Sequence, residues 1–256
     1  PLSVIWGDEQ LREGVDIQAQ AFYERLIVDP VHPTTSQPTP EAFLNAYQDA
    51  QRGGAEAVVA ITMSAAMSGT HESARIAASM ADLPVHVVDS KANSMSLGWQ
   101  VLAAVRARET GGDVRAMLAA AAAARNTMVY IITLDTLEYL HKGGRIGGAK
   151  RFIGTLLNLK PQIWVNHETG EVEGGRQTRT HTRALKALYE DFFNALDPQR
   201  PMRIAVLHNN ARDEAERLAE KVRKAHDPKE LMIRIVSPVL GVHTGPRAVA
   251  LCGYTE

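Results

Sequence analysis

The chain has 256 residues, of which 45% are hydrophobic and 22% are charged, and these proportions exclude a disordered or fibrous protein. Its 28 basic and 29 acidic residues leave a formal charge of −1, so no net field favours nucleic acid or an anionic membrane. The single cysteine, Cys252, excludes an intramolecular disulfide and a cysteine-based zinc site.

The length indicates one or two domains, since a domain typically has roughly 150 residues. The longest apolar run, Ala116–Ala124, has nine residues between Arg115 and Arg125 and is too short to span a bilayer. Asp8 and Arg12 interrupt the apolar opening of the chain, so no signal peptide is predicted. We therefore expect a cytoplasmic protein.

Short apolar runs alternate with amphipathic stretches along most of the chain, a pattern that predicts buried strands followed by helices. The predicted strands are Ala57–Thr62, Val85–Asp89, Met128–Leu134, Met202–His208 and Leu231–Val236. The predicted helices are Thr70–Ala81, Ser94–Arg108, Asp113–Arg125, Arg183–Leu196 and Ala211–Ala225. This alternation favours an α/β fold in which helices cover both faces of parallel strands.

The segment after residue 160 has a different pattern. Gln162–Asn166 and Glu171–Thr178 are separated by a turn at His167–Gly170, which predicts a β-hairpin and hence a mixed second sheet. We therefore expect two α/β domains that meet near residue 125. The first, over residues 1–125, has a Rossmann-like parallel sheet, and the second, over residues 126–256, has the mixed sheet.

The first segment with the residue types of a binding site is His32–Pro40. It places three hydroxyls and an amide between prolines that hold the backbone extended. Thr39 and Pro40 have the pattern of an N-cap followed by a first helical residue. The segment is either a capped loop or a polar clamp in which Thr35 or Ser36 donates to an anion or a carbonyl group.

A second candidate, Thr62–Thr70, lies between a predicted strand and a predicted helix, where ligands of open α/β sheets usually bind. Ser68 supplies a hydroxyl, and Gly69 allows the backbone to approach a ligand closely. The alternative is that Ser68 or Thr70 only caps the helix. A nucleophilic serine is disfavoured because the elbow motif requires glycine at the position of Ala66.

Three later segments are less specific. Lys142–Gly148 surrounds Arg145 with glycines and indicates either an anion-binding nest or a flexible turn. Arg176–Thr180 predicts a strand face that carries arginines, and Gly241–Pro246 predicts a short helix that starts at Pro246, just after His243. The nine histidines include no HExxH motif, so no metal site is predicted.

Taken together and in this order, the segments resemble the DegV family of bacterial fatty-acid-binding proteins, over essentially the whole chain. The matching segments are Gly14–Ile17, Thr34–Pro38, Ser68–Thr70, Val88–Lys91, Asp135–Leu140, Lys142–Ile146, Leu157–Pro161, Arg176–Arg179 and His243–Pro246. Members of the family usually open with a strand and a Thr-Asp-Ser-type loop, ahead of the segment that corresponds to Pro1–Ile5. We therefore expect further residues before Pro1.

The resemblance implies a carrier, not an enzyme, that binds one long-chain fatty acid such as palmitate and needs no cofactor. Thr35 and Ser68 would hydrogen-bond the carboxylate, with Ser36 and Gly69 beside them, and His243 would lie close to the headgroup. The carrier would present this carboxylate to a separate fatty-acid kinase, which makes an acyl-phosphate from ATP. Nucleic acid is not an expected partner, and membrane contact would be transient at most.

Three arginines also match positions in the family. Arg145 corresponds to an arginine at the headgroup end, and Arg176 or Arg179 to one associated with partner engagement or phosphoryl transfer. Two alternatives stay open at this point. One is an enzyme that acts on an anionic small molecule through Ser68, with His243 as base and Arg145 as electrostatic stabiliser. The other is a regulatory module that docks through the glycine–arginine loop.

Overall fold

The structure is a computed structural model that describes residues 1–152 and 159–256. It divides into two compact units. Unit 1 comprises Pro1–Ser36, Thr127–Val165 and Val172–Glu256, and unit 2 comprises Gln37–Asn126 and Asn166–Glu171. Unit 1 holds a mixed sheet and unit 2 a parallel one, so the predicted α/β class is confirmed.

A six-stranded sheet forms the centre of unit 1, in the order β10-β9-β11-β6-β7-β8. Its strands are β6 (Val129–Thr133), β7 (Lys160–Val165), β8 (Val172–Thr178), β9 (Met202–His208), β10 (Glu230–Ile235) and β11 (Val249–Thr255). Only β9 and β10 pair in parallel, and the other neighbours in this sheet pair antiparallel. The antiparallel pairing of β7 with β8 confirms the hairpin predicted from the sequence.

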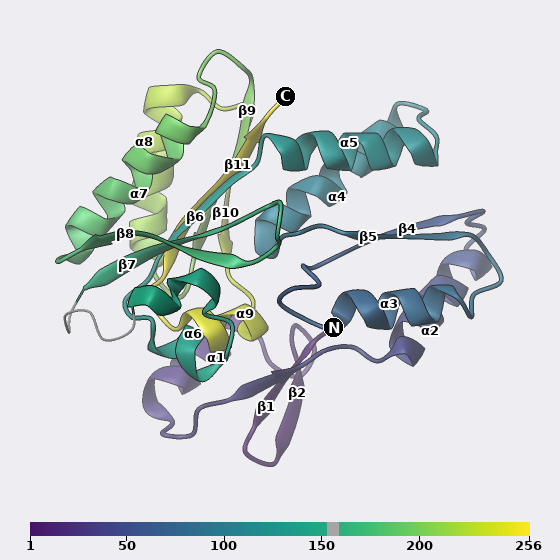
Figure 1. Ribbon diagram of the computed structural model, residues 1–256, viewed down its shortest axis with the longest axis horizontal. Helices are drawn as coiled ribbons and strands as arrows, with labels where there is room; N and C mark the ends of the chain where they lie inside the picture. The colour runs from purple at the N-terminus through teal and green to yellow at the C-terminus, as the bar shows by residue number, and fades with distance from the viewer. Residues whose placement is uncertain (153–158) are drawn as a thin grey trace. The chain divides into compact units, whose positions relative to one another are not determined.

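Two amphipathic helices, α7 (His181–Ala195) and α8 (Arg212–His226), run along one face of this sheet (Figure 1). Thr180 caps α7 by accepting a hydrogen bond from the backbone N–H of Arg183 at 3.3 Å. Acidic residues in the first turn of α8 and basic residues in its last turn suit the helix dipole. The buried side chains of both helices pack against those of the strands to form the main core of unit 1.

The first 36 residues pack against a helix that lies near the C-terminus of the sequence. They form the antiparallel sheet β2-β1-β3 and the helix α1 (Ala19–Val28), with β1 at Ser3–Trp6, β2 at Glu9–Arg12 and β3 at Thr34–Ser36. Trp6 and Phe22 pack in one core with Val242 of α9 (Pro238–Thr244). The remaining elements of unit 1 are α6 (Glu138–Lys142) and a 3-10 helix, Gly147–Phe152.

This packing corrects the predicted division into domains 1–125 and 126–256. Residues 1–36 belong to unit 1 because their apolar side chains are buried against α9, which lies over 200 positions later in the sequence. Residues 166–171, at the turn of the β7–β8 hairpin, belong to unit 2. Long-range packing of this kind leaves no local pattern in the sequence.

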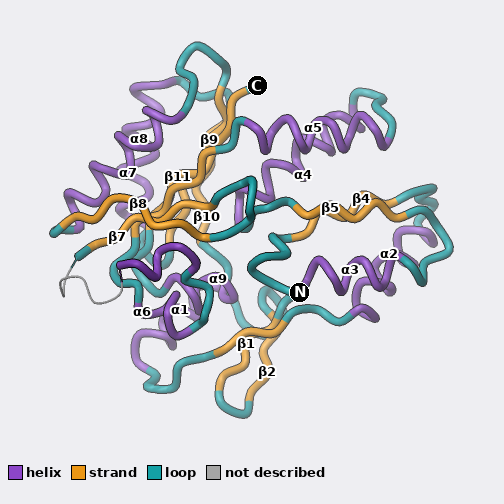
Figure 2. Tube along the Cα trace, in the orientation of Figure 1, coloured by secondary structure: helices purple, strands orange, loops and turns teal. Residues whose placement is uncertain are grey.

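Unit 2 is built on the parallel pair β4 (Val58–Thr62) and β5 (Val85–Asp89). Four helices surround it: α2 (Pro40–Arg52), α3 (Thr70–Ala78), α4 (Ser94–Glu109) and α5 (Val114–Asn126). Helices α2 and α3 lie on one face of the strands and α4 and α5 on the other (Figure 2). Thr39 caps α2 as predicted, accepting from the N–H of Ala42 at 3.2 Å.

Pro246 does not start a helix: it lies in a turn after α9, whose first residue is the earlier proline, Pro238. His243 therefore lies in the last turn of α9. The family-like segment Leu157–Pro161 falls partly outside the described residues, which exclude 153–158. In the described ranges no helix has the length and apolar character needed to cross a membrane.

Candidate functional site

A hydrogen bond between Thr35 and His243 lies at the centre of the candidate site in unit 1. Thr35 is in β3, where its backbone pairs with Val4 of β1, and His243 is in the last turn of α9. Thr35 Oγ1 and His243 Nε2 are 3.1 Å apart, and both side chains are half-buried. The structure therefore brings together two of the residues that the family resemblance assigns to one headgroup.

His243 is held in place by a close contact with the glycine-rich loop that follows α6. Its Nδ1 packs directly on Gly143, where any Cβ would collide with the ring. The same nitrogen is buried and has no hydrogen-bond partner among the described residues. The loop thus fixes the imidazole by shape, and Nε2 makes the one hydrogen bond described for the ring.

The electrostatics of this site keep His243 neutral. Burial, together with the positive charge of Arg145 and the proximity of His32, lowers the pKa of His243 to about 4. Arg145 itself is exposed, and its Nη1 donates to the carbonyl of Gly143 at 3.0 Å. Thr35, His243 and Arg145 therefore lie in one region, with a half-buried hydroxyl, a half-buried neutral imidazole and an exposed cation.

Ser68 and Gly69 lie in unit 2, in the loop between β4 and α3. Ser68 Oγ is 2.8 Å from Thr70 Oγ1 and accepts a hydrogen bond from the N–H of Thr70, the first residue of α3, at 3.2 Å. Gly69 packs so closely on Gln37 that a Cβ would collide with the amide. Thr70 is thus the hydrogen-bond partner described for the Ser68 hydroxyl, and Thr35 the one described for His243.

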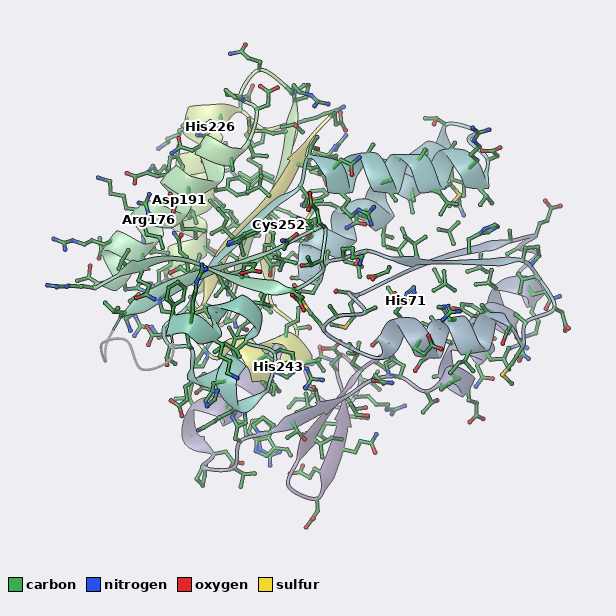
Figure 3. All side chains as sticks on the ribbon, in the orientation of Figure 1. His71, Arg176, Asp191, His226, His243 and Cys252 are labelled. Carbon is green, nitrogen blue, oxygen red and sulfur yellow. The ribbon has the colours of Figure 1, made fainter. Side chains whose placement is uncertain are left out.

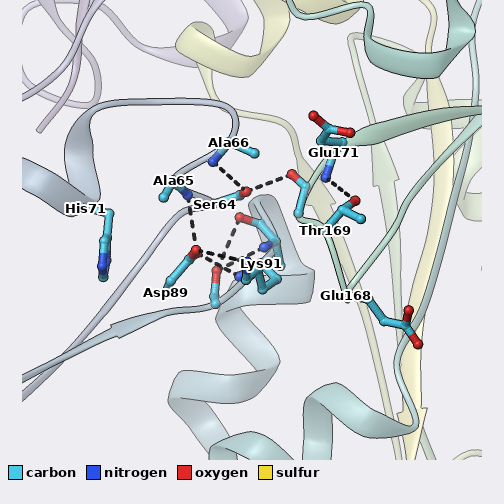
Figure 4. A network of polar contacts seen from close by, with 12 residues as sticks. Ser64, Ala65, Ala66, His71, Asp89, Lys91, Glu168, Thr169 and Glu171 are labelled. Carbon is cyan, nitrogen blue, oxygen red and sulfur yellow. Dashed lines mark hydrogen bonds and ion pairs between the residues drawn. The ribbon is translucent and has the colours of Figure 1, made fainter.

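A polar network shapes the loop that carries Ser68 (Figure 4). Asp89 Oδ1 accepts from the backbone N–H groups of Ala65 and Lys91, at 3.2 Å and 3.0 Å. Ser64 Oγ donates to the carbonyl of Gly170 at 2.7 Å, and the N–H of Ser68 donates to the Ser64 carbonyl at 3.1 Å. Through Asp89, the family-like segment Val88–Lys91 thus supports the loop that carries Ser68.

The other predicted site residues have different surroundings. Arg176, in β8, is exposed, and its Nη2 donates to Oδ1 of Asp191 in α7 at 2.6 Å (Figure 3). Its Nη1 lies 3.5 Å from Glu190 Oε2. Arg179 is exposed just beyond β8, and Ser36 pairs with Ser3 at the end of β3. Outside residues 153–158, no three His, Cys, Asp or Glu side chains gather closely enough to hold a metal ion.

Sequence reasoning missed two aromatic rings near His243. His32 precedes β3 and Tyr139 lies in α6, and their rings are 5.7 Å apart between centroids. Tyr139 also packs directly on Gly245, just after α9. Both residues fall within segments that the sequence singled out, but a role for their rings follows only from the packing of α6 on α9.

Comparisons with known proteins give consistent results over the whole chain. The sequence pattern of the DegV family matches residues 1–256. A DegV domain-containing protein of Streptomyces coelicolor is 39% identical over 252 residues, which span 96% of this chain and 86% of that protein.

Two solved structures are similar across this chain. One is a DegV family protein from Thermus thermophilus whose structure concerns its fatty acid binding. Its TM-score is 0.93, with 31% identity over 100% of this chain and 91% of that chain. The other is a stearic-acid-binding protein from Eubacterium ventriosum, with a TM-score of 0.88 and 26% identity over 100% of this chain and 90% of that chain.

Proposed function

The chain belongs to the DegV family, and from this premise we propose that it binds one long-chain fatty acid, such as palmitate, without a covalent bond. The observation that carries the proposal is the whole-chain similarity to the fatty-acid-binding protein of Thermus thermophilus. The stearic-acid-binding relative indicates the length of chain to expect. Titration of delipidated protein with palmitate tests it: saturable binding of one molecule per chain is expected, and no binding would overturn the proposal.

In this proposal Thr35 donates its hydroxyl proton to the carboxylate, and the tautomer of His243 makes that possible. A neutral imidazole carries its proton on one nitrogen only. With the proton on Nε2, the ring donates to Thr35 Oγ1 and leaves the threonine O–H free for the ligand. With the proton on Nδ1, the threonine would donate to the ring instead, and a buried N–H would lack a partner.

Ser68 is proposed as a second hydroxyl donor to the carboxylate, with Gly69 and Ser36 beside the headgroup. The support is the family pattern at Thr34–Pro38 and Ser68–Thr70. Either hydroxyl of the Ser68–Thr70 pair can be the donor. When Thr70 donates to Ser68 Oγ, the hydroxyl proton of Ser68 is available to another acceptor. The serine is thus able to turn its own proton toward an anion without leaving Thr70 unpaired.

Binding energy and orientation come from different parts of the ligand. Burial of an acyl chain contributes about 0.8 kcal/mol per methylene, so about fourteen methylenes contribute on the order of 11 kcal/mol before the costs of binding. Hydrogen bonds to a charged carboxylate contribute about 1.5–3 kcal/mol each. We expect the chain to supply most of the affinity and the hydroxyls to decide where the carboxylate points.

We further propose that the protein is a carrier whose partner is a fatty-acid kinase that phosphorylates the bound carboxylate. The positive charge of Arg145 acts on His243, and Arg145 is exposed, as contact with a second protein requires. Arg176 and Arg179 are exposed on and just after β8 and are proposed to engage the kinase. The test is acyl-phosphate formation from ATP by the kinase with this protein as its only source of fatty acid.

A further inference from the structure

His32 lies beside the proposed headgroup site, but neither Thr35 nor His243 forms a hydrogen bond with it. It precedes Thr35 by three residues, and Pro33, which follows it, restricts its backbone to an extended conformation. Its ring lies against Tyr139, with centroids 5.7 Å apart. Tyr139 packs on Gly245, and its helix leads into Gly143, on which His243 packs. His32 is also close enough to His243 to lower the pKa of that imidazole.

The Nε2 atom of His32 is buried and has no hydrogen-bond partner among the described residues. Buried polar atoms in folded proteins are almost always paired, and leaving one unpaired is costly. Burial and the charge of Lys142 lower the pKa of His32, so the ring is neutral at pH 7 and carries one N–H. An oxygen atom of a ligand would satisfy this nitrogen.

We propose that His32 is a further binding residue of the headgroup site, donating through Nε2 to the carboxylate of the bound fatty acid. This inference rests on the proposed function. A carboxylate has two oxygens and about four acceptor positions, more than the proposed Thr35 and Ser68 hydroxyls fill. The assignment explains why a polar ring occupies a place against Tyr139 where an apolar side chain would pack without leaving an unpaired atom.

The test compares two ligands and two variants. His32→Leu keeps an apolar group of similar bulk against Tyr139 but removes the donor. Palmitate and the alcohol of the same chain length are each titrated into delipidated protein. We expect His32→Leu to weaken palmitate binding at least about tenfold, the effect of one hydrogen bond to a charged group, and to weaken alcohol binding less, because a hydrogen bond to a neutral hydroxyl is weaker. His141→Ala, which removes an exposed imidazole from the same helix as Tyr139, should change neither.

A readout of stability separates this role from a structural one. Because His32→Leu removes a buried unpaired polar atom, the ligand-free variant should melt at the same temperature as the wild type or higher. Unchanged palmitate binding, or equal losses for palmitate and the alcohol, would overturn the role of His32. Failure of the wild type to bind palmitate at all would instead overturn the proposed function.

Discussion

Thr35 Oγ1 and His243 Nε2 are 3.1 Å apart although 208 positions separate the two residues in the sequence. The contact exists because β3 pairs with β1 and α9 packs in the same core as Trp6 and Phe22. The first strands and the last helix of the chain thus jointly build the proposed headgroup site.

Loss of the Thr35 hydroxyl should affect transfer more than binding. We expect Thr35→Ala to weaken palmitate affinity modestly, by about tenfold, since one hydrogen bond to the carboxylate is lost while the buried chain is unchanged. Kinase-coupled turnover should fall further, because the carboxylate is no longer oriented. Calorimetric titration and acyl-phosphate formation measure the two effects. Thr35→Ser should restore both, and equal losses of binding and turnover would contradict the division of roles. Ser68→Ala should behave as Thr35→Ala does.

The neutral state of His243 predicts acid sensitivity of the ligand-free protein. Its pKa is about 4 in the folded chain and about 6.5 when unfolded, so between these values the unfolded chain binds more protons. Stability is therefore full above pH 6.5 and falls as the pH drops toward 4, by about 3 kcal/mol at most from this residue. Urea unfolding across this range should show a flatter dependence for His243→Gln.

His167, in unit 2, is a second histidine whose pKa is lowered as that of His243 is. Burial and the charge of Arg125 also lower its pKa to about 4, and its Nε2 lies 2.7 Å from Ser96 Oγ. His167→Gln should flatten the same part of the pH profile without changing palmitate affinity. If neither variant differs from the wild type between pH 6.5 and 4, the two histidines are not neutral and buried as described.

Gly143 should be intolerant of any side chain because His243 packs directly on it. Gly143→Ala forces the imidazole to move, so we expect a loss of about 1–3 kcal/mol in unfolding free energy and a clear loss of palmitate affinity. Gly144→Ala is the control: the new Cβ meets open space, although the φ of +70° strains it. That variant should lose stability but keep its affinity. The account of how His243 is positioned fails if both variants bind palmitate like the wild type.

Arg176 should matter to the partner and not to the fold. Its ion pair with Asp191 is exposed, and such pairs contribute about 0–1 kcal/mol. We expect Arg176→Ala to keep its stability and palmitate affinity but to reduce kinase-coupled turnover. Arg212→Ala removes a comparable exposed arginine, paired with Glu216 on α8, and should have no effect on turnover. Equal turnover for both variants would exclude Arg176 from the kinase contact.

The sequence predicted elements well where local pattern determines them. β5 and β9 have the bounds that their apolar runs indicated, and the hairpin was expected from its turn. The predicted helix start at Pro246 was wrong. The preference for proline at a first helical position applies to Pro238 as well as to Pro246, and in the structure it is Pro238 that begins a helix. The place of residues 1–36 in unit 1 depends on packing against α9 and could not be read locally.

The candidate site was predictable only in part. Thr35, Ser68 and His243 came from a family pattern, because a hydroxyl or an imidazole alone has no specific meaning in a sequence. Their hydrogen bonds could not be foreseen, since they depend on how distant elements pack. His32 and Gly143 gain their roles solely from proximity to Tyr139 and His243, so the structure was needed to identify them.

The most direct test of the central claim is to purify the protein from cells, extract it with organic solvent and analyse the extract by mass spectrometry. Native mass spectrometry of the intact protein gives the stoichiometry. We predict one long-chain fatty acid per chain, displaced when the protein is delipidated and recovered on adding palmitate. A protein that is purified empty and takes up no added fatty acid would contradict the account.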